Sequence, residues 1–151
     1  MAGIKTISDN RKARHDYILE DTIETGIVLT GTEVKSLRNG QVNLKDAYAQ
    51  IKNGEVFLQQ MHISAYSHAY YGNHDPLRPR KLLLHRREIS KLIGKTKEKG
   101  YSLIPVKIYF KEGKVKIALA LARGKKVYDK RTALKEREAK LAMSRLNRQK
   151  Y

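Results

Sequence analysis

Between residues 104 and 121, apolar side chains recur at every second position in two runs, and this alternation strongly restricts the fold. The two runs are separated by the turn sequence Lys111-Glu112-Gly113. They comprise Ile104, Val106, Ile108 and Phe110, followed by Val115, Ile117, Leu119 and Leu121. Successive side chains of a strand point to opposite faces, so an alternating run places its apolar residues on one face. The pattern predicts an antiparallel hairpin with one buried face.

The preceding part of the chain predicts further strands. Asp46 to Ile63 alternates around Asn53-Gly54, a strong hairpin signal, and Leu82 to Leu84 is typical of a short buried strand. Residues 17–31 resemble two strands with a polar bend at Glu20, Asp21 and Glu24.

Short helices are predicted between these strands. One follows Thr32 as its N-cap and stops at Gly40, and another covers Arg86 to Gly100 with a break at Gly94. Antiparallel strands with small helical inserts favour a small, closed or nearly closed barrel.

The chain is expected to have three parts. Residues 1–16 form a basic N-terminal arm or an edge strand, residues 17–122 form the barrel, and residues 123–151 form a basic C-terminal tail. A length of 151 residues suits one domain of this kind. The tail has many helix formers but a narrow, alanine-rich apolar stripe. We therefore expect it to be disordered when free and helical against an anionic partner.

A net charge of +17 indicates an anionic partner. Residues 123–151 hold 11 basic and 3 acidic residues, so the tail is the most densely charged part of the chain. Nucleic acid is the commonest partner of such chains, because phosphate contacts release counterions. A membrane surface is the alternative, but it requires a basic helix with a strong apolar face.

Several other classes of protein are disfavoured. The chain has no cysteine, no apolar run of membrane-spanning length and no secretory signal, which favours a cytoplasmic protein that needs no disulfide. Nucleophile-elbow, P-loop and dinucleotide-binding motifs are absent, so no cofactor is expected. The sequence permits an RNA-cleaving set of histidine, lysine and acidic residues but does not point to one. His68 and His74 share one loop with Asp75, but a third ligand at a spacing typical of metal sites is missing, so no metal site is expected.

Basic residues are interleaved with rings that can stack on unpaired bases. Such clusters occur around residues 11–17, 78–81 and 85–87. Lys and Arg contact phosphates, whereas His and Tyr stack on bases, so the clusters favour RNA binding. Glu33 can be a helix-dipole acid in the first turn, an acceptor for a base amino group, or an organiser of neighbouring cations. Spacing alone favours the helix-dipole role.

Several sequence strings in the same order resemble a known family. NRKARHDYILED, GTEVKSLRNG, RPRKLLLHRREI and ARGKKVYDKRTALKERE are similar to the small protein B family, the bacterial tmRNA-binding (SsrA-binding) proteins. The resemblance runs from about Asn10 to Glu138. It implies an OB-type β-barrel, and it implies a non-enzymatic adaptor for the tRNA-like domain of tmRNA.

The resemblance also implies a mechanism. The protein would deliver tmRNA, together with elongation factor Tu, to stalled ribosomes for trans-translation. The barrel would stand in place of an anticodon arm. The tail would enter the decoding centre of 16S rRNA and the empty mRNA channel, where it becomes helical. Neither a membrane nor a small-molecule substrate is implied.

Two sets of site residues follow. Glu33, Leu83 and His85 match family positions implicated in tmRNA binding, although His85 is commonly Asn in relatives. With the basic clusters, the expected tmRNA-binding set is Arg11, Lys12, Arg14, His15, Glu33, Lys35, Arg38, Lys81, Leu83 and His85. The expected ribosomal set is Gly124, Lys125, Lys126, Tyr128, Asp129, Lys130, Arg131, Lys135 and Arg137. Tyr128 stands where some relatives have a histidine that is thought to stack on a decoding-centre base.

Two other functions fit a small, basic, tailed chain. A structural ribosomal protein would bind ribosomal RNA stoichiometrically and stay bound. An RNA-processing enzyme would turn over labelled RNA. Neither class is favoured by a motif in the sequence.

Overall fold

The computed structural model describes residues 3–69, 72–97, 100–124 and 137–142. The described strands are β1 (Ile4–Asp9), β2 (Tyr17–Ile27), β3 (Val42–Asn43), β4 (Tyr48–Lys52), β5 (Glu55–Gln59), β6 (His62–Ile63), β7 (Arg80–Leu83), β8 (Tyr101–Lys111) and β9 (Lys114–Gly124). The helices that separate them are α1 (Arg11–Asp16), α2 (Gly31–Arg38) and α3 (Arg86–Thr96). The prediction of a mainly antiparallel β protein with short helices is confirmed.

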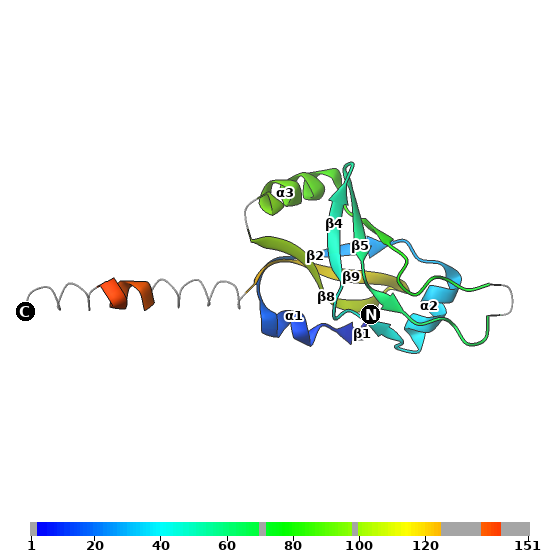
Figure 1. Ribbon diagram of the computed structural model, residues 1–151. Coiled ribbons are helices and arrows are strands. Elements are labelled where there is room, and N and C mark those ends of the chain that lie inside the picture. The colour runs from blue at the N-terminus through cyan, green and yellow to red at the C-terminus, as the bar shows by residue number, and fades with distance from the viewer. Residues whose placement is uncertain (1–2, 70–71, 98–99, 125–136, 143–151) are drawn as a thin grey trace, which may run out of the picture.

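The main sheet curls into a nearly closed ring (Figure 1). Its strand order is β1-β8-β4-β5-β7-β2-β9, and β8 also pairs with β9. The β8–β9 ladder runs the length of both strands, whereas β4 meets β8 through the pair Ala49 and Leu103. β1 pairs with the far half of the same β8 edge. Most buried aliphatic residues lie in one cluster inside the ring.

The two predicted hairpins are confirmed. Asn53 and Gly54 join β4 to β5, and Glu112 and Gly113 join β8 to β9. These four turn residues all have positive φ angles, between 52° and 75°. Turns of this hand match the natural twist of paired strands.

Bulges modify the predicted alternation. The register of β8 against β9 shifts between Pro105 and Lys107. As a result, Ile108 lies in the main core, whereas Ile104 packs with Ala13 in a separate cluster. The prediction that Ile104 and Ile108 share one face is therefore wrong. The predicted bend in residues 17–31 is a bulge at Asp21 within the continuous strand β2.

The N-terminal segment forms an edge strand followed by a helix that was not predicted. Asn10, which is buried, connects the two. Its side chain accepts a hydrogen bond from Ala13 N at 3.1 Å and donates to the carbonyl oxygens of Pro105 and Leu44 at 2.9 and 3.1 Å. The carbonyl oxygens of Pro105, at the β8 bulge, and of Leu44 thus hold the start of α1 against the ring.

The other two helices differ from prediction at their ends. α2 has Thr30, not Thr32, as its N-cap, and α3 continues through Gly94 as far as Thr96. Residues 137–142 of the tail are helical. The predictions for residues 125–136 and 143–151 lie outside the described residues.

Candidate nucleic-acid interface

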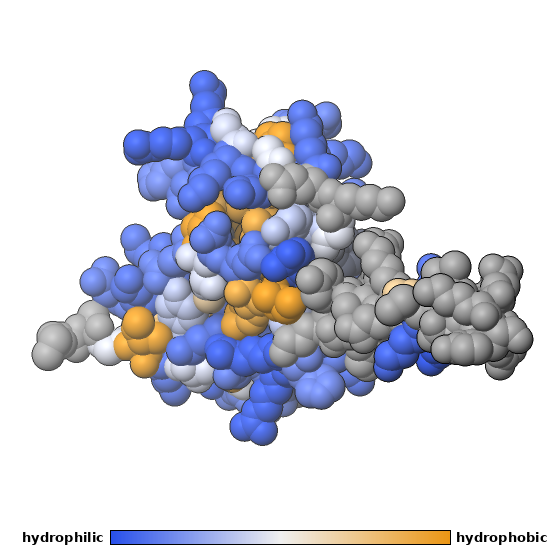
Figure 2. Space-filling model, turned by 90° about the vertical axis from the view of Figure 1, so that its left-hand side faces the viewer, coloured by the Kyte–Doolittle hydropathy of each residue, from blue (hydrophilic) through white to orange (hydrophobic). Residues whose placement is uncertain are grey.

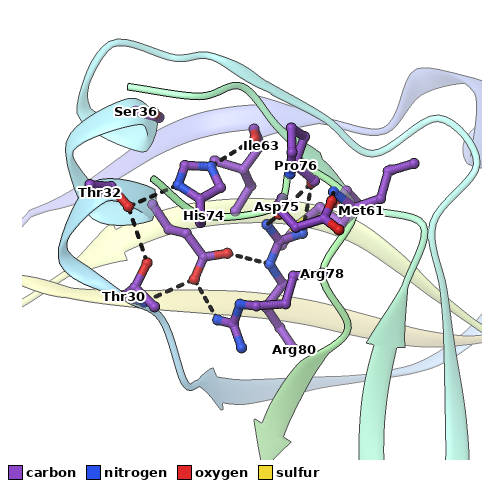
Figure 3. A network of polar contacts seen from close by, with 12 residues as sticks. Thr30, Thr32, Ser36, Met61, Ile63, His74, Asp75, Pro76, Arg78 and Arg80 are labelled. Carbon is purple, nitrogen blue, oxygen red and sulfur yellow. Dashed lines mark hydrogen bonds and ion pairs between the residues drawn. The ribbon is translucent and has the colours of Figure 1, made fainter. Parts of the chain in front are cut away.

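Glu33 is buried and is the common partner of a polar network between α2 and β7. Figure 3 shows three of its partners, Thr30, Arg78 and Arg80. It occupies the first turn of α2, where its Oε1 accepts a hydrogen bond from Thr30 N at 2.9 Å. The same oxygen accepts from Arg78 Nη2, and Oε2 accepts from Arg80 Nε, each at 2.5 Å. The carboxylate is therefore shared between capping a helix and holding two arginines.

Arg80 is the second fully buried member of this network. It is the first residue of β7 and lies two positions before buried Leu82, on the same face of the strand. Its side chain therefore points into the ring. Its guanidinium also donates to the backbone oxygens of Met61, Asp75 and Pro76. A buried charge requires a partner and satisfied hydrogen bonds, and Arg80 has both.

Burial and pairing act on the pKa values of this pair in opposite directions. Burial raises the pKa of Glu33, but hydrogen bonds from Arg78, Thr30 and Arg80 outweigh it, so the pKa lies below its ordinary value of 4.5. Burial lowers the pKa of Arg80, and Glu33 partly offsets this effect. Glu33 is therefore ionised at neutral pH.

The network also anchors the long connection between β6 and β7, described over residues 64–69 and 72–79 (Figure 3). His74 is buried, its Nε2 donates to the carbonyl oxygen of Ile63 at 2.9 Å, and its Nδ1 lies 2.9 Å from the Thr32 hydroxyl. Ser36 Oγ donates to the carbonyl oxygen of Ser64 at 2.7 Å. α2 thus holds this connection at both of its ends.

This geometry separates the three interpretations of Glu33. The first-turn acid and the organiser of cations are both found in the structure. Both carboxylate oxygens have protein donors, and the residue is 0 % exposed. Glu33 would consequently influence RNA affinity only indirectly, by positioning the residues to which it is hydrogen-bonded.

Leu83 lies at the opposite end of β7 and is 51 % exposed. It pairs across the ladder with Gly26 of β2, and a Cβ atom added to Gly26 would lie 3.3 Å from the Cβ of Leu83. Both residues line a shallow depression with His85 and Lys116. His85 is exposed at the start of α3, where its backbone N–H donates to Glu88 Oε1 at 2.9 Å. Leu83 and His85 therefore share one surface, apart from buried Glu33.

Two of the acidic residues of β2, Glu20 and Glu24, are engaged by cations. Glu20 pairs with Arg123 at 2.9 Å, and Glu24 pairs with Lys111 at 3.2 Å. Tyr109 also donates its hydroxyl proton to Glu24. This hydrogen bond, and the neighbouring Lys111 and Lys116, lower the pKa of Glu24 despite the opposing effect of burial, whereas burial and Glu24 raise the pKa of Tyr109.

The N-terminal basic cluster is exposed on α1, which lies at the other end of the ring from α2 (Figure 1). Lys12 pairs with Asp46 at 3.4 Å and Arg14 with Asp9 at 3.2 Å. His15 Nδ1 lies 2.9 Å from Asp16. Arg11 is also exposed here.

A groove of about 630 Å³ lies where β4 and β8 diverge, beside α1. Basic Lys12 and Lys45 line it together with Tyr17, Tyr48 and Tyr101. Figure 2 views the molecule from the side on which α3 lies in Figure 1, and apolar patches lie there within a mostly hydrophilic face. Asp16 and Asp46 line the groove as well, and Asp46 pairs with Lys12, so its two basic residues are matched by two acidic ones. The tyrosine rings are the lining groups that suit stacking on bases.

The remaining predicted residues lie elsewhere. Lys35 and Arg38 are exposed on α2, and Lys81 on β7 pairs with Glu55 at 3.1 Å. Gly124 ends β9 opposite Tyr17, and Arg137 is exposed in the short tail helix. Lys125, Lys126, Tyr128, Asp129, Lys130, Arg131 and Lys135 lie outside the described residues. The residues expected to bind tmRNA are thus divided between α1, α2 and the β7–α3 junction.

The described part of the chain offers neither a cluster of metal ligands nor a membrane-spanning helix. It contains no group of three or more potential metal ligands, and His74 is already engaged by Thr32 and Ile63. None of its helices combines the length and the apolar character that crossing a bilayer requires.

Sequence reasoning assigned Arg78 and Arg80 to an RNA-facing basic cluster and did not foresee their pairing with Glu33. The available signal for an inward-facing arginine was its spacing: Arg80 lies two positions before Leu82, so the two side chains share one face of the strand. Tyr66 and Asn73 were also missed, because their contacts form within a connection that shows no periodic pattern.

Comparison with known proteins gives concordant matches. Residues 7–149 match the family described as "SmpB protein". A protein of Desulfitobacterium hafniense called "SsrA-binding protein" is 61 % identical over 143 residues, covering 95 % of this chain and 92 % of its own length. The protein of that name from Geobacillus thermodenitrificans is 58 % identical over 146 residues, covering 97 % and 94 %.

A solved structure supports the same relationship. It is described as "tmRNA-SmpB: a journey to the center of the bacterial ribosome" and is similar to this chain with a TM-score of 0.67 and 50 % identity. The similarity covers 78 % of this chain and 83 % of the other.

Proposed function

The chain belongs to the SmpB family, a family of RNA-binding proteins rather than enzymes, and we propose that it binds tmRNA and acts with it on the ribosome in trans-translation. The observation that carries this proposal is identity of 58–61 % to SsrA-binding proteins over nearly the whole chain. The net charge of +17 supports an RNA partner independently.

The finer proposal concerns the division of labour. The near-closed ring is an OB-type barrel that binds the tRNA-like domain and stands in place of an anticodon arm. Residues 123–151 enter the decoding centre of 16S rRNA and the empty mRNA channel, where they become helical. Elongation factor Tu completes the delivery complex, which acts with ribosomes in the cytoplasm.

The exposed basic groups of the ring support a tmRNA-contacting surface that extends over several elements. α1 carries exposed cations at one end of the ring, whereas α2 and the β7–α3 junction carry others. Within this proposal, Leu83 and His85 contact tmRNA directly. Arg11, Lys12, Arg14, Lys35, Arg38 and Lys81 contribute to phosphate contacts.

The experiment that tests the proposal is competition binding at near-physiological salt. The labelled probe is the tRNA-like domain of tmRNA, and the competitors are ordinary tRNA and an unrelated hairpin of similar length. We expect tmRNA to be preferred by orders of magnitude. Equal competition by all three RNAs would leave only electrostatic attraction and would favour a structural ribosomal protein.

A tail truncation tests the division of labour. Removing residues 125–151 is expected to leave tmRNA affinity largely intact and to abolish peptide tagging in a translation assay. Loss of both together would show that the tail is part of the tmRNA clamp. Sedimentation with ribosomes at moderate salt adds a second test, because an adaptor dissociates whereas a structural subunit stays.

A further inference from the structure

The connection between β6 and β7 presents a cluster of aromatic and basic side chains beside α2. Lys35 Nζ lies 5.5 Å from the centre of the Tyr66 ring, within the range of a cation–π contact. The His68 ring meets Tyr66 edge-on, with ring centres 5.5 Å apart and an interplanar angle of 74°. Lys35 and His68 are exposed, and Tyr66 is partly exposed.

Tyr66 is held in place by its backbone. The side-chain oxygen of Asn73 accepts from Tyr66 N at 3.1 Å, and its amide nitrogen donates to Tyr66 O at 2.8 Å. Asn73 precedes His74, whose buried ring is fixed to α2 and to Ile63. The two hydrogen bonds with the Asn73 side chain fix the backbone that carries the Tyr66 ring, which lowers the cost of ordering it when a ligand binds.

The buried network reaches the same place from the other side. Glu33 pairs with Arg80, and Arg80 donates to the backbone oxygens of Asp75 and Pro76, next to His74. Pro76 O also accepts from Ile63 N at 3.0 Å. A continuous set of hydrogen bonds therefore joins Glu33 to the segment that holds Tyr66.

We propose that Tyr66, with His68 and Lys35, forms a stacking site for an unpaired RNA base, and that Glu33 is a positioning residue for this site. A tyrosine ring stacks on any base, whereas Lys35 supplies a charge for the adjoining phosphate. This inference rests on the proposed function, because it assumes that the protein binds RNA. It gives a route by which a fully buried glutamate would affect RNA affinity without touching RNA.

The first test removes the ring. Tyr66→Ala is expected to weaken binding of the tRNA-like domain about tenfold at near-physiological salt, within the range for loss of one base–aromatic stack. Tyr66→Phe keeps the ring and restores most of the affinity. Leu77→Ala removes an apolar side chain that is 45 % exposed on the same connection and serves as the matched control.

The second test is a double-mutant cycle for the positioning role. Glu33→Gln weakens binding severalfold in the wild-type background and adds nothing once Tyr66 is alanine, because the ring it positions is gone. Equal losses in both backgrounds would overturn the positioning role. Should Glu33→Gln fail to fold, Asn73→Ala, which releases Tyr66 without touching the buried ion pair, replaces it in the same cycle.

The outcomes separate this inference from the proposed function. If the wild-type protein does not prefer the tRNA-like domain over ordinary tRNA, the proposed function fails. If the wild type shows that preference and Tyr66→Ala binds as well as Leu77→Ala, the stacking site is overturned. A larger loss for Tyr66→Ala, with an unchanged circular dichroism melt, supports it.

Discussion

Glu33 and Leu83 occupy opposite environments although both match family positions implied in binding the same RNA. Glu33 is 0 % exposed and surrounded by protein donors, whereas Leu83 is 51 % exposed beside His85. The family resemblance therefore selects both a residue that can touch RNA and one that shapes the protein. Substitutions at Glu33 should therefore mainly lower the stability of the fold, whereas substitutions at Leu83 should mainly lower RNA affinity.

The largest expected effect is on the stability of the buried pair. Glu33→Ala leaves buried Arg80 without its counter-charge and removes the bond to Thr30 N, so the free energy of unfolding should fall by about 3–5 kcal/mol. Urea unfolding followed by circular dichroism measures this. The control is Glu55→Ala, which breaks the exposed pair with Lys81 and should cost at most about 1 kcal/mol. Equal losses would abolish the distinction between buried and exposed pairs.

The second prediction concerns acid. Because the folded-state pKa of Glu33 lies below 4.5, its ionised form stabilises the fold above that pH, and this contribution is lost as the pH falls through the folded pKa. The stability difference between wild type and Glu33→Gln should accordingly be full near neutrality and shrink below about pH 4.5. Thermal melts between neutral and acid pH measure this difference. A difference that stays constant with pH would contradict an ionised Glu33.

The third prediction is that a change at exposed Leu83 lowers RNA affinity while leaving the stability of the fold nearly unchanged. Leu83→Ala should reduce affinity for the tRNA-like domain about five- to tenfold while lowering stability by no more than about 1 kcal/mol, because half of the side chain is already in water. Ile4→Ala, at another exposed aliphatic position, should leave affinity unchanged. A large loss of stability in Leu83→Ala would make Leu83 a core residue and remove the contrast with Glu33.

The smallest effect is expected at Gly26. An alanine Cβ there would lie 3.3 Å from the Cβ of Leu83, a tight contact that a shift of a few tenths of an ångström can relieve. Gly26→Ala should displace Leu83 slightly and weaken RNA binding by less than Leu83→Ala does. Gly26→Ala combined with Leu83→Ala should bind like Leu83→Ala alone. Additive losses in competition binding would mean that Gly26 affects RNA independently of Leu83.

Local patterns predicted the hairpins well and the long-range features poorly. Asn53-Gly54 and the alternation after Val115 determine turn and strand within a few residues, so β4–β5 and β8–β9 could be anticipated. The bulges at Asp21 and Pro105 depend on the partner strand, and they changed which residues share a face. α1 was missed because Ala13 is its only buried residue and the rest of the helix is polar.

The same contrast between local and long-range features holds for the candidate site. Family motifs selected Glu33, Leu83 and His85, and alternation along β7 could have shown which way each side chain of that strand faces. Nothing near Glu33 in the sequence indicates its burial, because Arg78 and Arg80 are 45 and 47 positions away. A pairing between distant residues becomes visible only when the chain is folded.

The weak join between β4 and β8 has a consequence for how the chain folds. β8 and β9 are neighbours in sequence and can zip from their turn, whereas the pair Ala49 and Leu103 joins residues far apart in the chain. Bringing distant segments together costs loop-closure entropy before any contact repays it. The β2–β9 ladder also joins distant residues, but it offsets that cost with pairs from Tyr17 to Gly26, whereas β4 and β8 share one pair. The ring should therefore be assembled as an open sheet first, with the β4–β8 seam formed late in folding.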